Sequence, residues 1–251
     1  MNINILLPYK EKFTKDKASS VSITVSNNLK YSKFKKNISV YGQSVEKPLY
    51  VKHFIGIKKP WNLLKSKNLH NALKMCQKIN NDNKPSIIEI HNRPYLIEYV
   101  KTKLRSSHCL TLFLHNDPLE MRGSKSVKER LDLLSNLDKV YCVSKYIKKR
   151  FLEGISHESK KVVVLYNGVT RNIKKPPKKK KQVIFVGRIV PEKGVHLFKD
   201  AIKEIYEFSK KWEFVIIGSP KLGINKLDNF SKKIKTDFEK LGPRAKMIGF
   251  V

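Results

Sequence analysis

Short apolar runs alternate along this chain with longer segments whose apolar residues fall at helical spacing, and this alternation constrains the fold most. Nearly continuous apolar strands that alternate with helices are typical of a parallel sheet covered on both faces. The pattern predicts a doubly wound α/β fold. The expected strands are Ile3–Leu7, Ile38–Tyr41, Ile87–Ile90, Leu110–His115, Val140–Val143, Val162–Leu165, Val183–Val186, Phe214–Ile217 and Met247–Phe250. The expected helices are Trp61–Ile79, Val127–Leu137, Tyr146–Leu152, Val195–Phe208 and Leu227–Leu241.

One segment interrupts the alternation. The sequence KKPPKKKK at 174–181 has no apolar anchor, and its prolines and repelling lysines favour an extended chain. Such a run is found in protein tails that bind nucleic acid or phospholipid, and also in linkers between domains. Because a complete strand and helix follow it, we interpret 173–181 as a linker between a first domain, 1–172, and a second, 182–251. The second segment is about half the size of a doubly wound domain, so we expect an incomplete one.

The charge balance is unusual. The formal net charge is +32, and only 8 of the 53 basic residues are arginine. Base and phosphate recognition relies on arginine, whereas a lysine excess also arises from composition alone and forms a solvated surface. An anionic partner, such as a phospholipid surface, a diphosphate or RNA, is the alternative. The lysine run contains no aromatic residue for base stacking, so we expect no specific nucleic-acid partner.

Several features bear on localisation. No stretch approaches the ~18 apolar residues of a membrane-spanning helix, and the N-terminus lacks the basic and apolar regions of a signal peptide. The three cysteines are widely spaced and fit neither a disulfide framework nor a thiolate metal site. We therefore expect a cytoplasmic protein, peripheral at most on the inner face of the cell membrane.

The segment VIFVGRIVPEKGVHLFKDAI at 183–202 contains a candidate anion site. Gly187 ends a buried strand, and its missing side chain lets a ligand approach the backbone. Arg188 and Lys193 follow in a turn, and Gly194 opens a helix. Two cations facing a helix N-terminus suit a diphosphate. The alternative is an ordinary strand-to-helix turn that carries two surface cations.

Polar pairs also end two expected strands of the first domain. The pair His91–Asn92 closes one strand, and His115–Asn116, followed by Asp117, closes another. Open α/β sheets bind ligands at the carboxyl ends of their strands, so these residues are candidate cleft residues for an acceptor. Each histidine alone would more often be a core or strand-end residue whose hydrogen bonds are made within the protein. The repeated His–Asn pair favours a role in ligand binding instead.

The motif FVGRIVPEKGV, followed by an amphipathic helix, resembles the donor-site signature of the family 4 retaining glycosyltransferases. Their GT-B fold consists of two Rossmann-like doubly wound domains. The resemblance implies that Gly187, Arg188 and Lys193 bind the diphosphate of a nucleotide-sugar donor. It also implies that His115 is catalytic and sits where donor sugar and acceptor meet.

Three further segments resemble the same family. They are VYCVSKYIKKRF at 140–151, where Ser144 is expected to cap a helix, VVVLYNGV at 162–169, and the start ILLPYKEKFTKDKASSV. The start matches the family's first strand and its loop onto the donor phosphates. Most members carry glycines where this chain has Ala18, Ser19 and Ser20. Because serine can donate hydrogen bonds, Ser19 and Ser20 are expected donor contacts.

The resemblance implies an enzyme that transfers a sugar with retention to an envelope saccharide, as in lipopolysaccharide biosynthesis, or to a lipid-linked acceptor. The donor is a substrate, and no cofactor or metal is expected, since the Asp-x-Asp motif of metal-dependent transferases is lacking. The family's later pair of glutamates, separated by seven residues, does not occur before Val251, which suggests a C-terminally truncated chain. A non-catalytic nucleotide-binding remnant and, less favoured, a basic nucleic-acid-binding protein are the alternatives.

Overall fold

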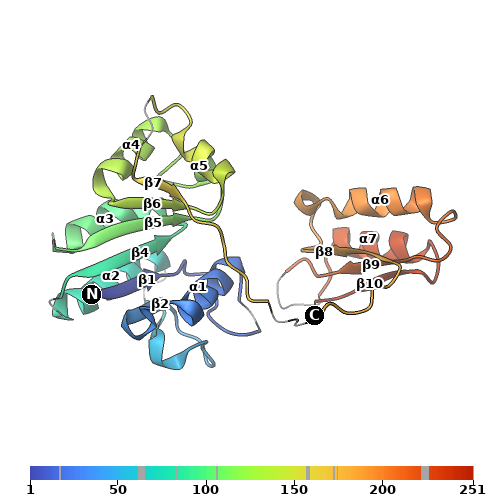
Figure 1. Ribbon diagram of the computed structural model, residues 1–251, viewed down its shortest axis with the longest axis horizontal. Coiled ribbons are helices and arrows are strands. Elements are labelled where there is room, and N and C mark those ends of the chain that lie inside the picture. Colours follow the sequence, from blue (N-terminus) through green and yellow to red (C-terminus); the bar gives the residue numbers. More distant parts are fainter. Residues whose placement is uncertain are drawn as a thin grey trace. The chain divides into compact units, whose positions relative to one another are not determined.

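A computed structural model describes residues 1–16, 18–61, 66–82, 84–105, 107–156, 159–171, 173, 175–221 and 226–250. The chain divides into two compact units, residues 1–170 and 171–251 (Figure 1). Each unit is built on its own parallel sheet. The α/β class predicted from the sequence is confirmed.

The first unit contains a seven-stranded parallel sheet with the order β3-β2-β1-β4-β5-β6-β7. The strand bounds are β1 Asn2–Leu6, β2 Ile38–Gln43, β3 Phe54–Ile57, β4 Ser86–His91, β5 Cys109–Leu114, β6 Lys139–Cys142 and β7 Val162–Val164. The chain adds strands outward from β1 in one direction and then returns to add β4 on its other side. The carboxyl ends of β1 and β4 therefore flank the switch point where doubly wound sheets bind ligands.

Helices cover both faces of this sheet. Their bounds are α1 Ser20–Tyr31, α2 Lys67–Asp82, α3 Ile97–Lys103, α4 Val127–Asn136 and α5 Lys145–Leu152. The neighbouring strand residues Ile5 and Leu6 point to opposite faces. Ile5 packs with residues of α1 in one apolar cluster, and Leu6 belongs to a second cluster with residues of α2 to α5. The helix α1 thus lies on the opposite face from the other four.

The second unit contains a three-stranded parallel sheet with the order β10-β9-β8. Its elements are β8 Gln182–Val186, α6 Val195–Ile205, β9 Glu213–Ile217, α7 Asn229–Glu239 and β10 Ala245–Ile248. Residues of α6 and α7 pack with Phe214, Ile216 and Ala245 into one core. On the other face of the sheet Val186 remains 74% exposed and Ile184 47% exposed. In the described part of this unit the helices therefore bury one face of the sheet.

The structure differs from the sequence prediction in several elements. It adds α1, α3 and β3, and β10 begins two residues earlier than the expected strand. The expected helix at 61–79 begins at Lys67, and residues 62–65 lie outside the described residues. In the predicted linker at 173–181, residue 174 lies outside them as well; the remainder is exposed and forms neither helix nor strand.

Candidate functional site

The predicted polar residues of the first unit gather at the carboxyl ends of β4 and β5. His91 is the last residue of β4, and His115 directly follows β5. The nitrogen atoms His91 Nδ1 and His115 Nε2 lie 2.9 Å apart, at hydrogen-bonding distance. His91 is 1% exposed, and its ring stacks on Phe113 with centroids 4.8 Å apart. The structure thus brings the two predicted histidines into direct contact.

Burial changes the acid–base character of this pair. The pKa of His115 is lowered to about 3. Burial away from solvent is the larger cause, and the nearby His91 ring is the smaller one. His115 is therefore neutral at physiological pH. A neutral imidazole can accept a hydrogen bond at one nitrogen while it donates at the other.

Asn92 holds the loop that carries His115. Its side-chain Oδ1 accepts a hydrogen bond of 2.8 Å from the backbone N–H of His115, and its own N–H donates to the carbonyl of Phe113. Asn92 has a φ of +50°, a left-handed conformation that asparagine tolerates better than most residues. The residue is 6% exposed. Its observed contacts therefore position His115, and the cleft role predicted for Asn92 stays a prediction.

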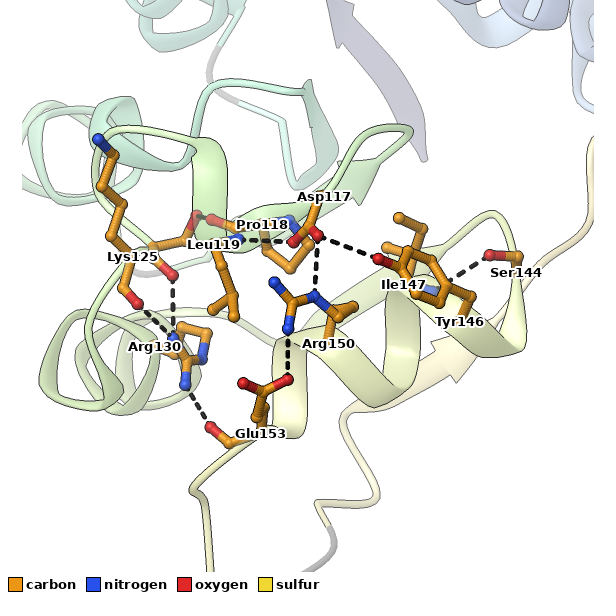
Figure 2. A network of polar contacts seen from close by, with 11 residues as sticks. Asp117, Pro118, Leu119, Lys125, Arg130, Ser144, Tyr146, Ile147, Arg150 and Glu153 are labelled. Carbon is orange, nitrogen blue, oxygen red and sulfur yellow. Dashed lines mark hydrogen bonds and ion pairs between the residues drawn. The ribbon is translucent and has the colours of Figure 1, made fainter. Parts of the chain in front are cut away.

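Asp117 belongs to a network that joins the end of β5 to α5 (Figure 2). Its carboxylate accepts hydrogen bonds from the Leu119 N–H at 2.9 Å, from Arg150 Nε at 2.8 Å and from the Tyr146 hydroxyl at 3.3 Å. Burial alone would raise the pKa of Asp117, but the hydrogen bonds from Arg150 and from the Leu119 N–H lower it overall. The described contacts of Asp117 support the loop, while Asn116 beside it is exposed.

A buried arginine forms the other half of this network. Arg130 on α4 is 2% exposed, and Figure 2 shows its guanidinium between three backbone carbonyls. It donates to the carbonyl of Lys125 at 2.7 Å, to that of Ser124 at 3.2 Å, and to that of Glu153. The Glu153 side chain in turn accepts from Arg150 at 2.5 Å. The loop after η4 (Pro118–Glu120), helix α4 and the end of α5 are thus connected through two arginines.

A carboxylate of the chain itself lies at the N-terminus of α1. The carboxylate of Glu11 accepts hydrogen bonds from the Ser19 hydroxyl, from the Ser22 N–H at 3.3 Å and from the Ser22 hydroxyl at 3.2 Å. A carboxylate at this position is favoured by the helix dipole. A donor phosphate at Ser19 would have to displace Glu11. The contacts predicted for Ser19 and Ser20 with a donor stay predictions.

In the second unit two glycines meet at the carboxyl ends of β8 and β9. Gly218 has a φ of +144°, and a Cβ atom there would lie 1.9 Å from the carbonyl oxygen of Gly187. Only glycine fits, because any side chain would overlap that carbonyl. Beside this contact lies a hollow of about 170 Å³, lined by Val186, Gly187, Arg188, Ile217, Gly218, Ser219 and Phe250.

The two predicted cations lie between β8 and α6. Arg188 follows Gly187 and lines the hollow, and Lys193 ends the short helix η5 (Pro191–Lys193). Gly194, with a φ of +70°, is the N-cap residue directly before α6. Both cations are exposed, and within the part of the chain that the structure describes their head groups form no hydrogen bond or ion pair. They are therefore available to an anion near the N-terminus of α6.

Sequence reasoning missed several residues that shape these sites. Gly218 had a signal, because it follows a buried strand just as Gly187 does. Glu11, Arg130 and Glu89, whose Oε2 lies 3.7 Å from His91 Nε2, had none, since acidic and basic residues on a charged chain do not show which partners they contact. The expected cap at Ser144 is confirmed, because its hydroxyl accepts from the Ile147 N–H at 3.1 Å.

Known proteins resemble both parts of this arrangement. The model of the family Glycosyl transferases group 1 matches residues 168–251, which include Gly187, Arg188 and Lys193. The uncharacterized glycosyltransferase MJ1178 of Methanocaldococcus jannaschii is 37% identical over 137 residues, covering 53% of this chain and 36% of that protein. The chain thus spans about a third of the length of the curated relatives it matches.

Solved structures show the same fold. Anabaena Alr3699/HepE in complex with UDP superposes with a TM-score of 0.70 at 17% identity, covering all of this chain and 70% of that one. A glycosyltransferase of Rickettsia africae superposes with a TM-score of 0.68 at 19% identity, covering all of this chain and 68% of that one. These likenesses establish the GT-B architecture predicted from the sequence, and the family match supports a glycosyltransferase.

Proposed function

We propose that this chain acts in glycosyl transfer, with a nucleotide-diphosphate sugar as the donor. One observation carries the proposal. The segment that matches the glycosyltransferase family carries two exposed cations, Arg188 and Lys193, whose head groups have no partner among the described residues. Arg188 lines a hollow at the carboxyl edge of a parallel sheet, and Lys193 lies just before the N-terminus of α6. The UDP complex of the Anabaena neighbour is consistent with such a donor.

The chemistry follows from the charges. Transfer of the sugar leaves a nucleoside diphosphate, so negative charge develops on its phosphate oxygens. Cations near the N-terminus of α6 stabilise this charge in the transition state, and such electrostatic stabilisation is usually the largest contribution to rate. Arg188 binds two phosphate oxygens through its planar fork, and Lys193 acts as a point charge. No metal is required for this role.

His115 is the proposed catalytic residue of the first unit. We expect His115→Ala to lower the turnover of a nucleotide-sugar donor by at least ~100-fold, as loss of one preorganised hydrogen bond at a reaction centre does. The affinity for UDP should change less than about twofold, because Arg188 and Lys193 remain. Release of the nucleoside diphosphate from a panel of UDP- and GDP-sugars, with a calorimetric titration of UDP, measures both quantities.

The matched control is His53→Ala. His53 contacts the carbonyl of Ile38, the first residue of β2. This contact lies at the amino ends of the strands, whereas His115 lies at the carboxyl ends of the same sheet. This variant should keep full turnover. Equal losses in both variants would contradict the role of His115. UDP binding without turnover in the unmodified chain would instead favour a non-catalytic nucleotide-binding remnant.

We further propose that sugar transfer proceeds with retention, to an envelope saccharide or a lipid-linked acceptor, and that the +32 charge brings the protein to an anionic membrane surface. No helix in the described residues is long and apolar enough to cross a bilayer. Each lysine near an anionic leaflet contributes ~1 kcal/mol, and the attraction fades within a Debye length. Lysine suits this role, because its ammonium is a compact point charge that needs no directional fork of hydrogen bonds.

At physiological salt we expect the protein to bind vesicles that contain anionic lipid and to leave neutral vesicles unbound. A panel of RNA and DNA sequences is the comparison, since so cationic a chain binds any polyanion weakly. Salt-resistant preference for one nucleic-acid sequence, without vesicle binding, would support the nucleic-acid alternative. The family match does not favour that alternative.

A further inference from the structure

The two histidine rings of the first unit face each other through a single pair of nitrogens. His91 Nδ1 and His115 Nε2 are 2.9 Å apart, so in a neutral pair one nitrogen donates and the other accepts. Two arrangements satisfy this contact. Either His91 donates, and His115 then carries its proton on Nδ1, or His115 donates, and its Nδ1 is bare.

Glu89 distinguishes the two arrangements. It lies two residues before His91 on β4, so both side chains point to the same face of the sheet. Its Oε2 is 3.7 Å from His91 Nε2, and that nitrogen is buried with no hydrogen-bond partner in the described residues. A proton on His91 Nε2 is attracted to the carboxylate, whereas a lone pair there is repelled. The carboxylate therefore favours the proton on Nε2, which leaves His91 Nδ1 to accept from His115.

The packing fixes the ring planes that this argument requires. His91, Phe113 and Tyr141 are register partners on β4, β5 and β6, and their rings stack in sequence at 4.8 Å and 4.7 Å. The neighbours of Glu89 on this face have other partners. Thr111 donates to the carbonyl of Ile88, and Lys139 donates to that of Lys160.

We propose that Glu89 and His91 are positioning residues that hold His115 in the tautomer protonated on Nε2, so that its bare Nδ1 accepts a hydrogen bond from a substrate hydroxyl. Only the nature of the hydroxyl-bearing substrate, a sugar, rests on the proposed function. Toward the substrate, His115 then acts as an acceptor and not as a donor. The low pKa of His115 agrees, because a group that must accept cannot be protonated on both nitrogens.

The tautomer can be measured without any substrate. In the full chain labelled with ¹⁵N, long-range ¹H–¹⁵N correlation spectra near pH 7.5 report which ring nitrogen of each histidine carries the proton. A variant that lacks His91 or His115 loses the ring signals of that histidine, and these losses assign the two rings. We expect the proton on Nε2 in both.

Three variants test the two positioning residues. Glu89→Leu removes the carboxylate and should convert His115 to a mixture or to the Nδ1-protonated form. His91→Asn keeps an acceptor close to the position of Nδ1 and should preserve the Nε2-protonated form. His91→Phe keeps the stacking on Phe113 but removes the acceptor, and the preference of His115 should be lost.

A His115 protonated on Nδ1 in the unmodified chain would overturn the proposal. A His91 protonated on both nitrogens would have this result too, because its Nδ1 would then donate to His115 Nε2. A His115 tautomer unchanged in Glu89→Leu would also overturn the proposal. Because the first measurement uses the unmodified protein, unfolding of a variant does not remove the test. In the active enzyme Glu89→Leu should lower turnover about ten- to a hundredfold at unchanged UDP affinity. Correct tautomers without UDP binding would refute the proposed function alone.

Discussion

Arg188→Ala is expected to weaken UDP binding by roughly ten- to a hundredfold. A hydrogen bond to a charged group contributes about 1.5–3 kcal/mol, and the arginine fork can form two such bonds to a diphosphate. Arg188 has no protein partner in the described residues, so its removal should affect the ligand and leave the fold unchanged. Lys193→Ala should weaken binding less, because ammonium is a point charge without the fork. Isothermal calorimetry with UDP measures both affinities.

The control separates a specific contact from the loss of one charge among many. Lys210 is exposed and lies just before β9, at the amino edge of the same sheet. Lys210→Ala removes the same charge as Lys193→Ala away from the proposed site and should leave UDP affinity within about twofold. Uridine, which lacks phosphates, should bind the unmodified chain and Arg188→Ala equally. Unchanged UDP affinity in both Arg188→Ala and Lys193→Ala would refute the assignment.

Arg130→Met is expected to destabilise the first unit by about 3 kcal/mol. Methionine fills much of the same volume but cannot donate hydrogen bonds to the carbonyls of Ser124, Lys125 and Glu153. Acceptors left unpaired in a buried site cost about 1–3 kcal/mol each, reduced where water can reach them. The free energy of opening, measured by hydrogen exchange of the amides in α4 and α5, reports this unit separately from the second.

Lys128→Met is the matched control, because Lys128 is exposed on the same helix two residues earlier. It should change the opening free energy by less than about 0.5 kcal/mol. Arg130→Lys should fall between the two, since one ammonium can reach some of these carbonyls. Equal stability of Arg130→Met and Lys128→Met would show that the network in Figure 2 is not needed for the fold.

Local pattern was sufficient for most strands and for the donor motif. A buried parallel strand must be apolar along its whole length, so its sequence identifies it without knowledge of its neighbours. The motif around Gly187 and Arg188 is equally local, because a strand, a turn and a helix N-terminus follow one another directly. The helix α1 escaped prediction for the opposite reason. Its sequence SVSITVSNNLKY is rich in β-branched and small polar residues, and tertiary packing of Val21, Val25 and Leu29 stabilises it.

The sequence by itself thus determined the α/β class, the two candidate sites and most of the residues in them. The tertiary structure decided which side chains meet. Glu11 accepts hydrogen bonds at the N-terminus of α1, Arg130 donates to three backbone carbonyls, and the Glu89 carboxylate lies beside His91 Nε2. The physical reason is that a strand's periodicity fixes which face a side chain occupies, whereas the partner on that face comes from a strand or loop many residues away. His91 and His115 are 24 residues apart in sequence, and only the register of β4 on β5 brings their rings into contact.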